Sequence, residues 1–359
     1  MNGESEEASG ERPARRRRKA APVSATGDDE AQAQAVVQTP SEDDDDPATA
    51  ASPECGETDE TGPAPHAILV MFQMTNDAHG SISRGVVEEV MEQVGRLPES
   101  SRGGRLDVWL ESPGGDAHSA YKLGLYLRSK FSEINFVVPD YAKSAATLLS
   151  LAGDRIYMAP AAELGPLDIQ EVREGEIRMR SALDTADSIQ ALWDEAITQV
   201  LLSGGVVLQQ TGLARDKTIS HLLEFAGDFM RPLLEQLDPV AIKAANTSLL
   251  VAMEYGARLL AYRTGDDLED VYPRIERMIR RYPTHGYVID RTEARDRLGL
   301  PVEKIEDYDL EFHCDAWHSV ARNNPVSLVQ LFSLAELERI SRGEHDDAIP
   351  DETEADGDE

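Results

Sequence analysis

Cysteine is nearly absent from this sequence, since only Cys55 and Cys314 occur in 359 residues. Two cysteines cannot form a disulfide framework, so we expect a protein of a reducing compartment, the cytoplasm. Basic residues are also few, with 35 lysines and arginines against 67 aspartates and glutamates. Phosphate binding needs a basic face, so this balance argues against a nucleic-acid partner. No apolar run approaches the ~20 residues of a membrane span, so no integral membrane segment is expected.

Aromatic residues are missing from residues 1–62, which are rich in Ala, Ser, Glu, Asp and Pro and contain the acidic run Asp43–Asp46. Such a segment cannot bury enough apolar surface to offset its ordering entropy, so we predict a disordered acidic tail. Residues 344–359 hold nine acidic residues and no lysine or arginine, and we predict a second acidic tail there. Between the tails we expect a catalytic core over 63–185 and a mostly helical region over 186–343 that completes the same domain.

Strand-like and helix-like segments alternate in the core, which predicts an α/β fold with a mainly parallel sheet. Apolar runs of strand length lie at 66–72, 105–110, 134–138 and 155–158, and helical patterns lie at 81–97, 117–129 and from about 144 to 151. Helical candidates follow at 187–203, 217–236, 239–263, 266–281 and 291–298, with a short extended segment at 286–289. Sites in parallel sheets form at the carboxyl ends of strands, which singles out the loops after Leu110 and Val138.

Each of these two loops carries a candidate for chemistry. Gly114 and Gly115 follow a strand and precede a helix, where backbone N–H groups can approach an anion such as the oxyanion of a tetrahedral intermediate. A tight turn would need the same glycines. Ser144 opens the next helix, and it is either an N-cap or a nucleophile with the Ala145 N–H as a second oxyanion donor.

The segments Leu110–Gly115, Lys143–Leu149, Ala152–Met158 and Glu163–Gln170 resemble the ClpP/crotonase superfamily. Within it they are most similar to the serine dehydrogenase proteinase group, relatives of signal peptide peptidase A. A weaker similarity covers Thr284–Asp290, Glu293-Ala294 and Leu298–Leu300. The resemblance implies repeated β-β-α units and a serine nucleophile at Ser144. It also implies an oxyanion hole at Gly114, Gly115 and Ala145, a peptide or protein substrate and a homo-oligomer. We expect no cofactor, and the sequence has no phosphate-binding glycine fingerprint of the P-loop or dinucleotide type.

The general base is not fixed by the pattern. The chain departs from both branches of the superfamily, because it has no Lys or His from Ala145 to Asp216. His285 has the intrinsic pKa for the role and lies in the segment of weaker similarity, so we place it first. Asp168 stands about where the ClpP branch has a histidine, and we expect it to orient the base. Lysines come last: Lys217 or Lys243 would qualify if buried, whereas Lys143 is expected to be a solvated surface residue.

His313, Cys314 and His318 form a cluster, but a structural zinc site needs four ligands, so we expect no metal. The sequence therefore favours a serine peptidase-like hydrolase that acts by acyl transfer through Ser144. The alternative, prompted by the missing base, is a catalytically inactive crotonase-fold oligomeric scaffold or adaptor.

Overall fold

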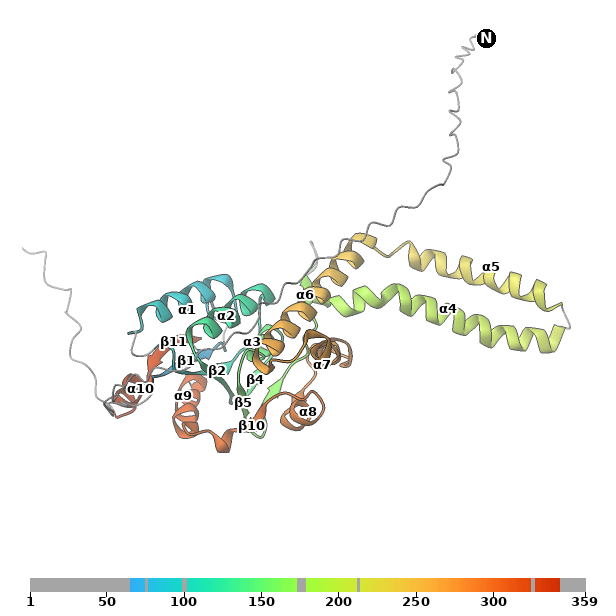
Figure 1. Ribbon diagram of the computed structural model, residues 1–359. Helices are drawn as coiled ribbons and strands as arrows, with labels where there is room; N and C mark the ends of the chain where they lie inside the picture. The colour runs from blue at the N-terminus through green and yellow to red at the C-terminus, as the bar shows by residue number, and fades with distance from the viewer. Residues whose placement is uncertain are drawn as a thin grey trace, which may run out of the picture. The chain divides into compact units, whose positions relative to one another are not determined.

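The computed structural model contains a central sheet of six strands in the order β10-β5-β3-β2-β1-β11 (Figure 1). Neighbouring strands are parallel, except that β11 runs antiparallel to β1. This confirms the predicted α/β fold with a mainly parallel sheet. The strands are β1 (His66–Phe72), β2 (Arg105–Glu111), β3 (Glu133–Val138), β5 (Arg155–Met158), β10 (Val302–Lys304) and β11 (Leu328–Ser333).

The structure describes residues 65–74, 77–98, 102–172, 179–211, 214–323 and 327–342, all of which belong to one compact unit. The two predicted acidic tails lie outside the described residues.

Helices α1 (Arg84–Arg96) and α2 (Ala117–Lys130) connect successive parallel strands and pack on one face of the sheet (Figure 1). Each begins at a side-chain cap. Ser83 accepts a hydrogen bond from the Val86 N–H at 3.3 Å, and Asp116 accepts one from the Ser119 N–H at 2.8 Å. The short helix α3 (Ala145–Ser150) is buried along its whole length. These elements lie close to the predicted ranges, which came from the apolar spacing of α1 and from the junctions that precede α2 and α3.

The C-terminal region contributes helices as predicted, and it also contributes strands that were not predicted. Its helices are α4 (Ala182–Thr211), α5 (Arg215–Leu234), α6 (Pro239–Thr264), α7 (Leu268–Arg280), α8 (Arg291–Asp296), α9 (Glu311–Asn323) and α10 (Leu334–Ser341), with a 3-10 turn at Ile305–Asp307. Strands β10 and β11 complete the two edges of the main sheet, and α9 and α10 cover its second face (Figure 1). The predicted extended segment ends in β9 (Ile289–Asp290).

Two smaller sheets lie outside the main one. Strands β4 (Tyr141–Ala142) and β6 (Glu163–Leu164) pair in parallel, and β9 pairs antiparallel with β6. Strands β7 (Gln170–Val172) and β8 (Met179–Ser181) form an antiparallel pair that leads into α4. The three-stranded sheet therefore brings residues near 290 beside the loop that contains Ser144.

Helix α4 is unusually apolar for its exposure. Over Ala182–Gln210 it is long and apolar enough to cross a membrane by length and composition alone, and only 11% of its most apolar window is buried. No continuous apolar run marks this helix in the sequence, because polar residues interrupt the stretch. Helix α5 packs beside α4 (Figure 1). Both helices expose large apolar side chains such as Trp193, Leu201, Phe225 and Phe229.

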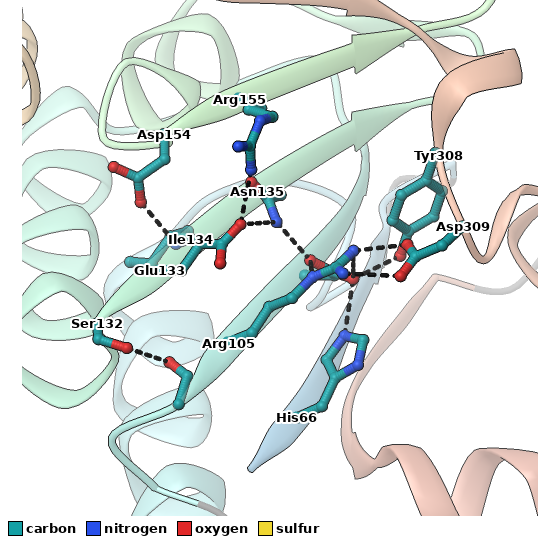
Figure 2. Close-up of polar contacts among 12 residues, drawn as sticks. His66, Arg105, Ser132, Glu133, Ile134, Asn135, Asp154, Arg155, Tyr308 and Asp309 are labelled. Atoms are coloured by element: carbon teal, nitrogen blue, oxygen red, sulfur yellow. Dashed lines mark hydrogen bonds and ion pairs between the residues drawn. The ribbon is translucent and has the colours of Figure 1, made fainter. Parts of the chain in front are cut away.

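A polar network is buried at the amino ends of the parallel strands. Figure 2 shows His66, Arg105 and Tyr308 pointing toward one another from three different segments. They meet at Asp107, which is fully buried and accepts hydrogen bonds from His66 Nε2, Arg105 Nε and the Tyr308 hydroxyl, each at 2.8 Å. Burial alone would raise the pKa of Asp107, but the hydrogen bonds from His66 and Arg105 outweigh it and hold the pKa below its ordinary value. The network joins β1, β2 and the segment before α9.

Replacing Asp107 with asparagine is expected to lower the free energy of unfolding by about 2–3 kcal/mol, because the Arg105 guanidinium loses its charged partner and one acceptor oxygen becomes a donor in a buried place. Asp309→Asn is the matched control, since Asp309 also pairs with Arg105, at 2.7 Å, but is 57% exposed. It should cost at most about 1 kcal/mol. Urea unfolding at pH 7 measures both. The stability that Asp107 contributes should vanish as the pH falls through its lowered pKa. Equal losses for the two variants would contradict the proposed role of burial.

Candidate active site

Ser144 has a strained backbone at the junction between β4 and α3. Its φ of 51° and ψ of −115° make it the one residue other than glycine with a positive φ in the described part of the chain. Such a conformation costs about 1–3 kcal/mol and persists where the surrounding structure enforces it. The side chain makes no capping hydrogen bond to α3, so the N-cap interpretation of this serine is wrong. A sharp strand-to-helix turn of this kind exposes a hydroxyl for chemistry.

The glycine loop after β2 lies against the Ser144 loop. Main-chain hydrogen bonds join the two loops on both sides of Ser112: its N–H donates to the Tyr141 carbonyl and its carbonyl accepts from the Lys143 N–H, each at 3.0 Å. Gly114 approaches so closely that a Cβ there would lie 2.6 Å from the Lys143 carbonyl oxygen. The two loops that the sequence singled out therefore meet in space.

The amides of these loops differ in what they bind. The Gly114 N–H donates to the Ser112 hydroxyl oxygen at 3.1 Å and is engaged. The Gly115 and Ala145 N–H groups have no acceptor among the residues that the structure describes. Both glycines have positive φ, 104° at Gly114 and 143° at Gly115, where an L side chain would be strained. Two free amides thus flank the Ser144 junction.

A cleft of about 820 Å³ contains Ser144, Gly114, Gly115 and His285. Its size suits a ligand of several residues or a small molecule. Helix α6 supplies a further wall through Thr247, Ser248 and Val251, and Ile169 and Gln170 lie on the segment that enters β7. Most of the lining is uncharged.

His285 combines burial with a free ring nitrogen. Its Nδ1 atom is buried and has no hydrogen-bond partner among the described residues. Burial lowers the pKa of His285 below its ordinary value; the charge of Asp168 and a hydrogen bond with its backbone oppose this shift, and the charge of Lys143 adds to it. The imidazole is therefore neutral at neutral pH, which is the form that accepts a proton. The Ser144 hydroxyl is not hydrogen-bonded to it, as is common in a site without substrate.

Asp168 lies beside His285 but directs its carboxylate elsewhere. Oδ1 accepts a hydrogen bond from the Leu183 N–H at 3.2 Å, at the start of α4. Burial raises the pKa of Asp168, while hydrogen bonds from Ser181 and Leu183 and the nearby His285 lower it in part. Asp168 thus acts on His285 through its charge and through a hydrogen bond from its backbone, whereas its carboxylate bonds the start of α4.

The lysine alternatives are excluded by position. Lys143 was expected to be solvated, but its side chain is only 14% exposed and its Nζ lies 2.7 Å from Glu163 Oε1. The reason is that the stem of Lys143 lies against Gly165, which has no side chain. The ion pair holds the Lys143 amine at Glu163, and Lys143 does not line the cleft that contains Ser144. Lys217 and Lys243 are both exposed and do not line the cleft.

Comparison with known proteins bears on this arrangement. Residues 84–194 match a family model described as ClpP-like SDH-type serine proteinase. This segment belongs to that family. Two uncharacterized proteins of Methanocaldococcus jannaschii are similar to the chain: one is 34% identical and the other 31% identical, each over 83 residues. The matches cover 23% of this chain and 28% and 27% of the relatives, so the chain spans well under a third of their length.

The SDH-type segment runs from α1 into α4 and contains Gly114, Gly115, Ser144, Ala145 and Asp168. His285 lies about ninety residues beyond its end, after α7. The glycine loop and Ser144 thus lie within the recognised family segment, whereas the candidate base comes from outside it. This explains why spacing within the segment offered no base.

His313, Cys314 and His318, which the sequence grouped as a cluster, all lie on α9 and do not line the cleft. His318 Nε2 is hydrogen-bonded to Glu111, and Cys314 packs in the core under α9. Among the described residues no group of three or more His, Cys, Asp or Glu lies close enough to hold a metal ion.

Sequence reasoning missed Ser112 and Gln73, whose side chains are fully buried beneath the glycine loop.

Proposed function

We propose that the cleft at Ser144 hydrolyses peptide bonds by acyl transfer. The observation that carries this proposal is the strained Ser144, whose hydroxyl does not cap α3 and whose cleft also holds the Gly115 amide and a neutral histidine. The membership of residues 84–194 in the SDH-type serine proteinase family supports it. A strained serine kept at a ligand-sized cleft is typical of a nucleophile.

The chemistry assigns one task to each group. Ser144 Oγ forms a bond to the substrate carbonyl carbon as its proton passes to His285, and the Gly115 and Ala145 amides hold the resulting oxyanion. The C–N bond then breaks, and His285 returns the proton to the leaving amine. Water then attacks the acyl-enzyme in the same way, giving a proton to His285, which returns it to Ser144 Oγ as the acid is released. In this scheme Gly114 provides close approach of the two loops, because its own amide is engaged by Ser112.

The test is hydrolysis of an unfolded protein such as denatured casein at neutral pH. Ser144→Ala should abolish cleavage. Ser150→Ala should not, although it also removes a serine hydroxyl; Ser150 is buried at the end of α3, which follows Ser144, and its hydroxyl bonds the Thr147 carbonyl at 2.7 Å. Equal cleavage by wild type and Ser144→Ala would reject the peptidase. It would favour the inactive scaffold.

We also propose that the chain acts as a homo-oligomer. Exposed apolar side chains on α4 and α5 support this, with Leu201 70% exposed and Phe225 66% exposed. Large exposed apolar patches mark interaction surfaces. Sedimentation of the purified chain tests it, and a monomer at all concentrations would contradict it.

A further inference from the structure

The glycine loop is held from inside the protein by a buried pair of side chains, Ser112 and Gln73. Both are fully buried, although each carries polar groups that must find partners. The Ser112 hydroxyl donates to Gln73 Oε1 at 2.6 Å and accepts from the Gly114 N–H at 3.1 Å. A hydroxyl has one proton, so its donation to Gln73 leaves a lone pair for Gly114. The two roles of the hydroxyl are thereby fixed.

Gln73 is itself held in one orientation. Its Nε2 donates to the His79 carbonyl at 2.6 Å and its backbone N–H donates to the Glu111 carbonyl at 2.7 Å. Because the amide nitrogen must face that carbonyl, Oε1 must face Ser112. The His79 segment continues to Ile82, which contacts the glycine loop from the other side. The contacts that run from Ser112 through Gln73 and the His79–Ile82 segment therefore return to the glycine loop.

Ile82 fixes the carbonyl end of Gly114. The Ile82 N–H donates to the Gly114 carbonyl at 2.7 Å, and the Asp116 N–H donates to the Ile82 carbonyl at 2.8 Å. In a planar trans peptide the C=O and the N–H point in opposite directions. The Gly114 carbonyl that faces Ile82 thus turns the Gly115 N–H away from Ile82. Ser112 holds one side of Gly114 and Ile82 holds the other, which sets both backbone angles of this glycine.

We infer that Ser112, fixed by Gln73, is a positioning residue that aims the Gly115 amide at the oxyanion. This inference rests on the proposed peptidase function. Gly114 has a φ of 104° and no side chain that could restrain its two peptide groups. The hydrogen bonds of Gly114 therefore supply the restraint. Without the Ser112 hydroxyl, the buried Gly114 N–H loses its acceptor and the Gly114–Gly115 segment can turn. The Gly115 amide then no longer points at a fixed place.

The experiment measures inactivation by a fluorophosphonate, in which Ser144 Oγ bonds to phosphorus, fluoride leaves and the hydroxyl proton passes to His285. The phosphoryl oxygen takes the place of the oxyanion, so the rate depends on the amides. Ser112→Ala should lower kinact by about 10–100-fold, part of the loss seen when an oxyanion donor is removed. KI and the midpoint of the pH profile should change little, because neither the cleft wall nor His285 is altered. If Ser112 only supported folding, Ser112→Ala would instead reduce the fraction of protein that reacts with the fluorophosphonate.

Ser150→Ala is the matched control and should keep the wild-type kinact. A wild-type kinact in folded Ser112→Ala would overturn the inference. If Ser112→Ala does not fold, Gln73→Met decides, since it keeps Ser112 but removes the group that fixes its hydroxyl. Its kinact should fall below that of Ser150→Ala, and equality of the two would overturn the inference. A wild type that never labels would overturn the peptidase proposal itself, and this inference with it.

Discussion

Replacement of His285 by alanine is expected to slow acylation of Ser144 by about 10²–10⁴-fold, the usual contribution of a general base. The reason is that the serine hydroxyl is a weak nucleophile until a neighbouring group takes its proton. Fluorophosphonate inactivation measures this rate directly. The wild-type rate should rise with pH as His285 loses its proton and then level off. Because burial lowers the pKa of His285, the midpoint should lie below 6.5.

His118 is the rival base, since it also lines the cleft. Its Nδ1 lies 2.9 Å from the Tyr255 hydroxyl, and it is exposed at the start of α2. His285→Ala should remove the pH dependence of inactivation, whereas His118→Ala should retain it. A larger loss of rate in His118→Ala than in His285→Ala would show that the base is misassigned.

Replacement of Gly114 by alanine is expected to lower the free energy of unfolding by about 3 kcal/mol or more and to abolish labelling of Ser144. The new Cβ would lie 2.6 Å from the Lys143 carbonyl oxygen and 3.0 Å from the Ala145 nitrogen. Both contacts are with backbone, which cannot move aside as a flexible side chain can. The Ser144 and glycine loops would therefore be forced apart at the reaction centre.

Gly103→Ala separates this clash from the strain of a positive φ. Gly103 has a φ of 82°, but nothing lies within 4 Å of the Cβ that it would gain. It should cost about 1–2 kcal/mol and leave labelling intact. Denaturant unfolding and labelling of both variants make the comparison. Equal losses of stability and labelling would mean that the close approach of the two loops has no special role.

The elements of the first half of the domain could be predicted because their cause is local. The apolar run of β1 and the helical spacing of Val86, Val90 and Val94 in α1 report burial directly in the sequence. The meeting of the two loops followed from a general property of parallel sheets, since both leave strands at their carboxyl ends. Strand β11 was missed because its place depends on pairing with β1, more than 250 residues earlier.

The site was only partly predictable for the same reason. The burial of Lys143 and its pairing with Glu163 depend on the parallel pairing of β4 with β6. The bond between Ser112 and Gln73 joins residues 39 apart, and no spacing in the sequence signals it. His285 was selected by its intrinsic pKa and by resemblance, and the fold brings it to the cleft through α7 and β9. Long-range contacts thus decided what local patterns left open.

The most direct test of the account is to map the fluorophosphonate adduct by mass spectrometry of the digested wild-type protein. We predict a single phosphonylated serine, Ser144, formed with loss of fluoride and absent from Ser144→Ala. An adduct on another residue, or the same adduct yield in Ser144→Ala as in wild type, would contradict the claim that this strained serine is the nucleophile.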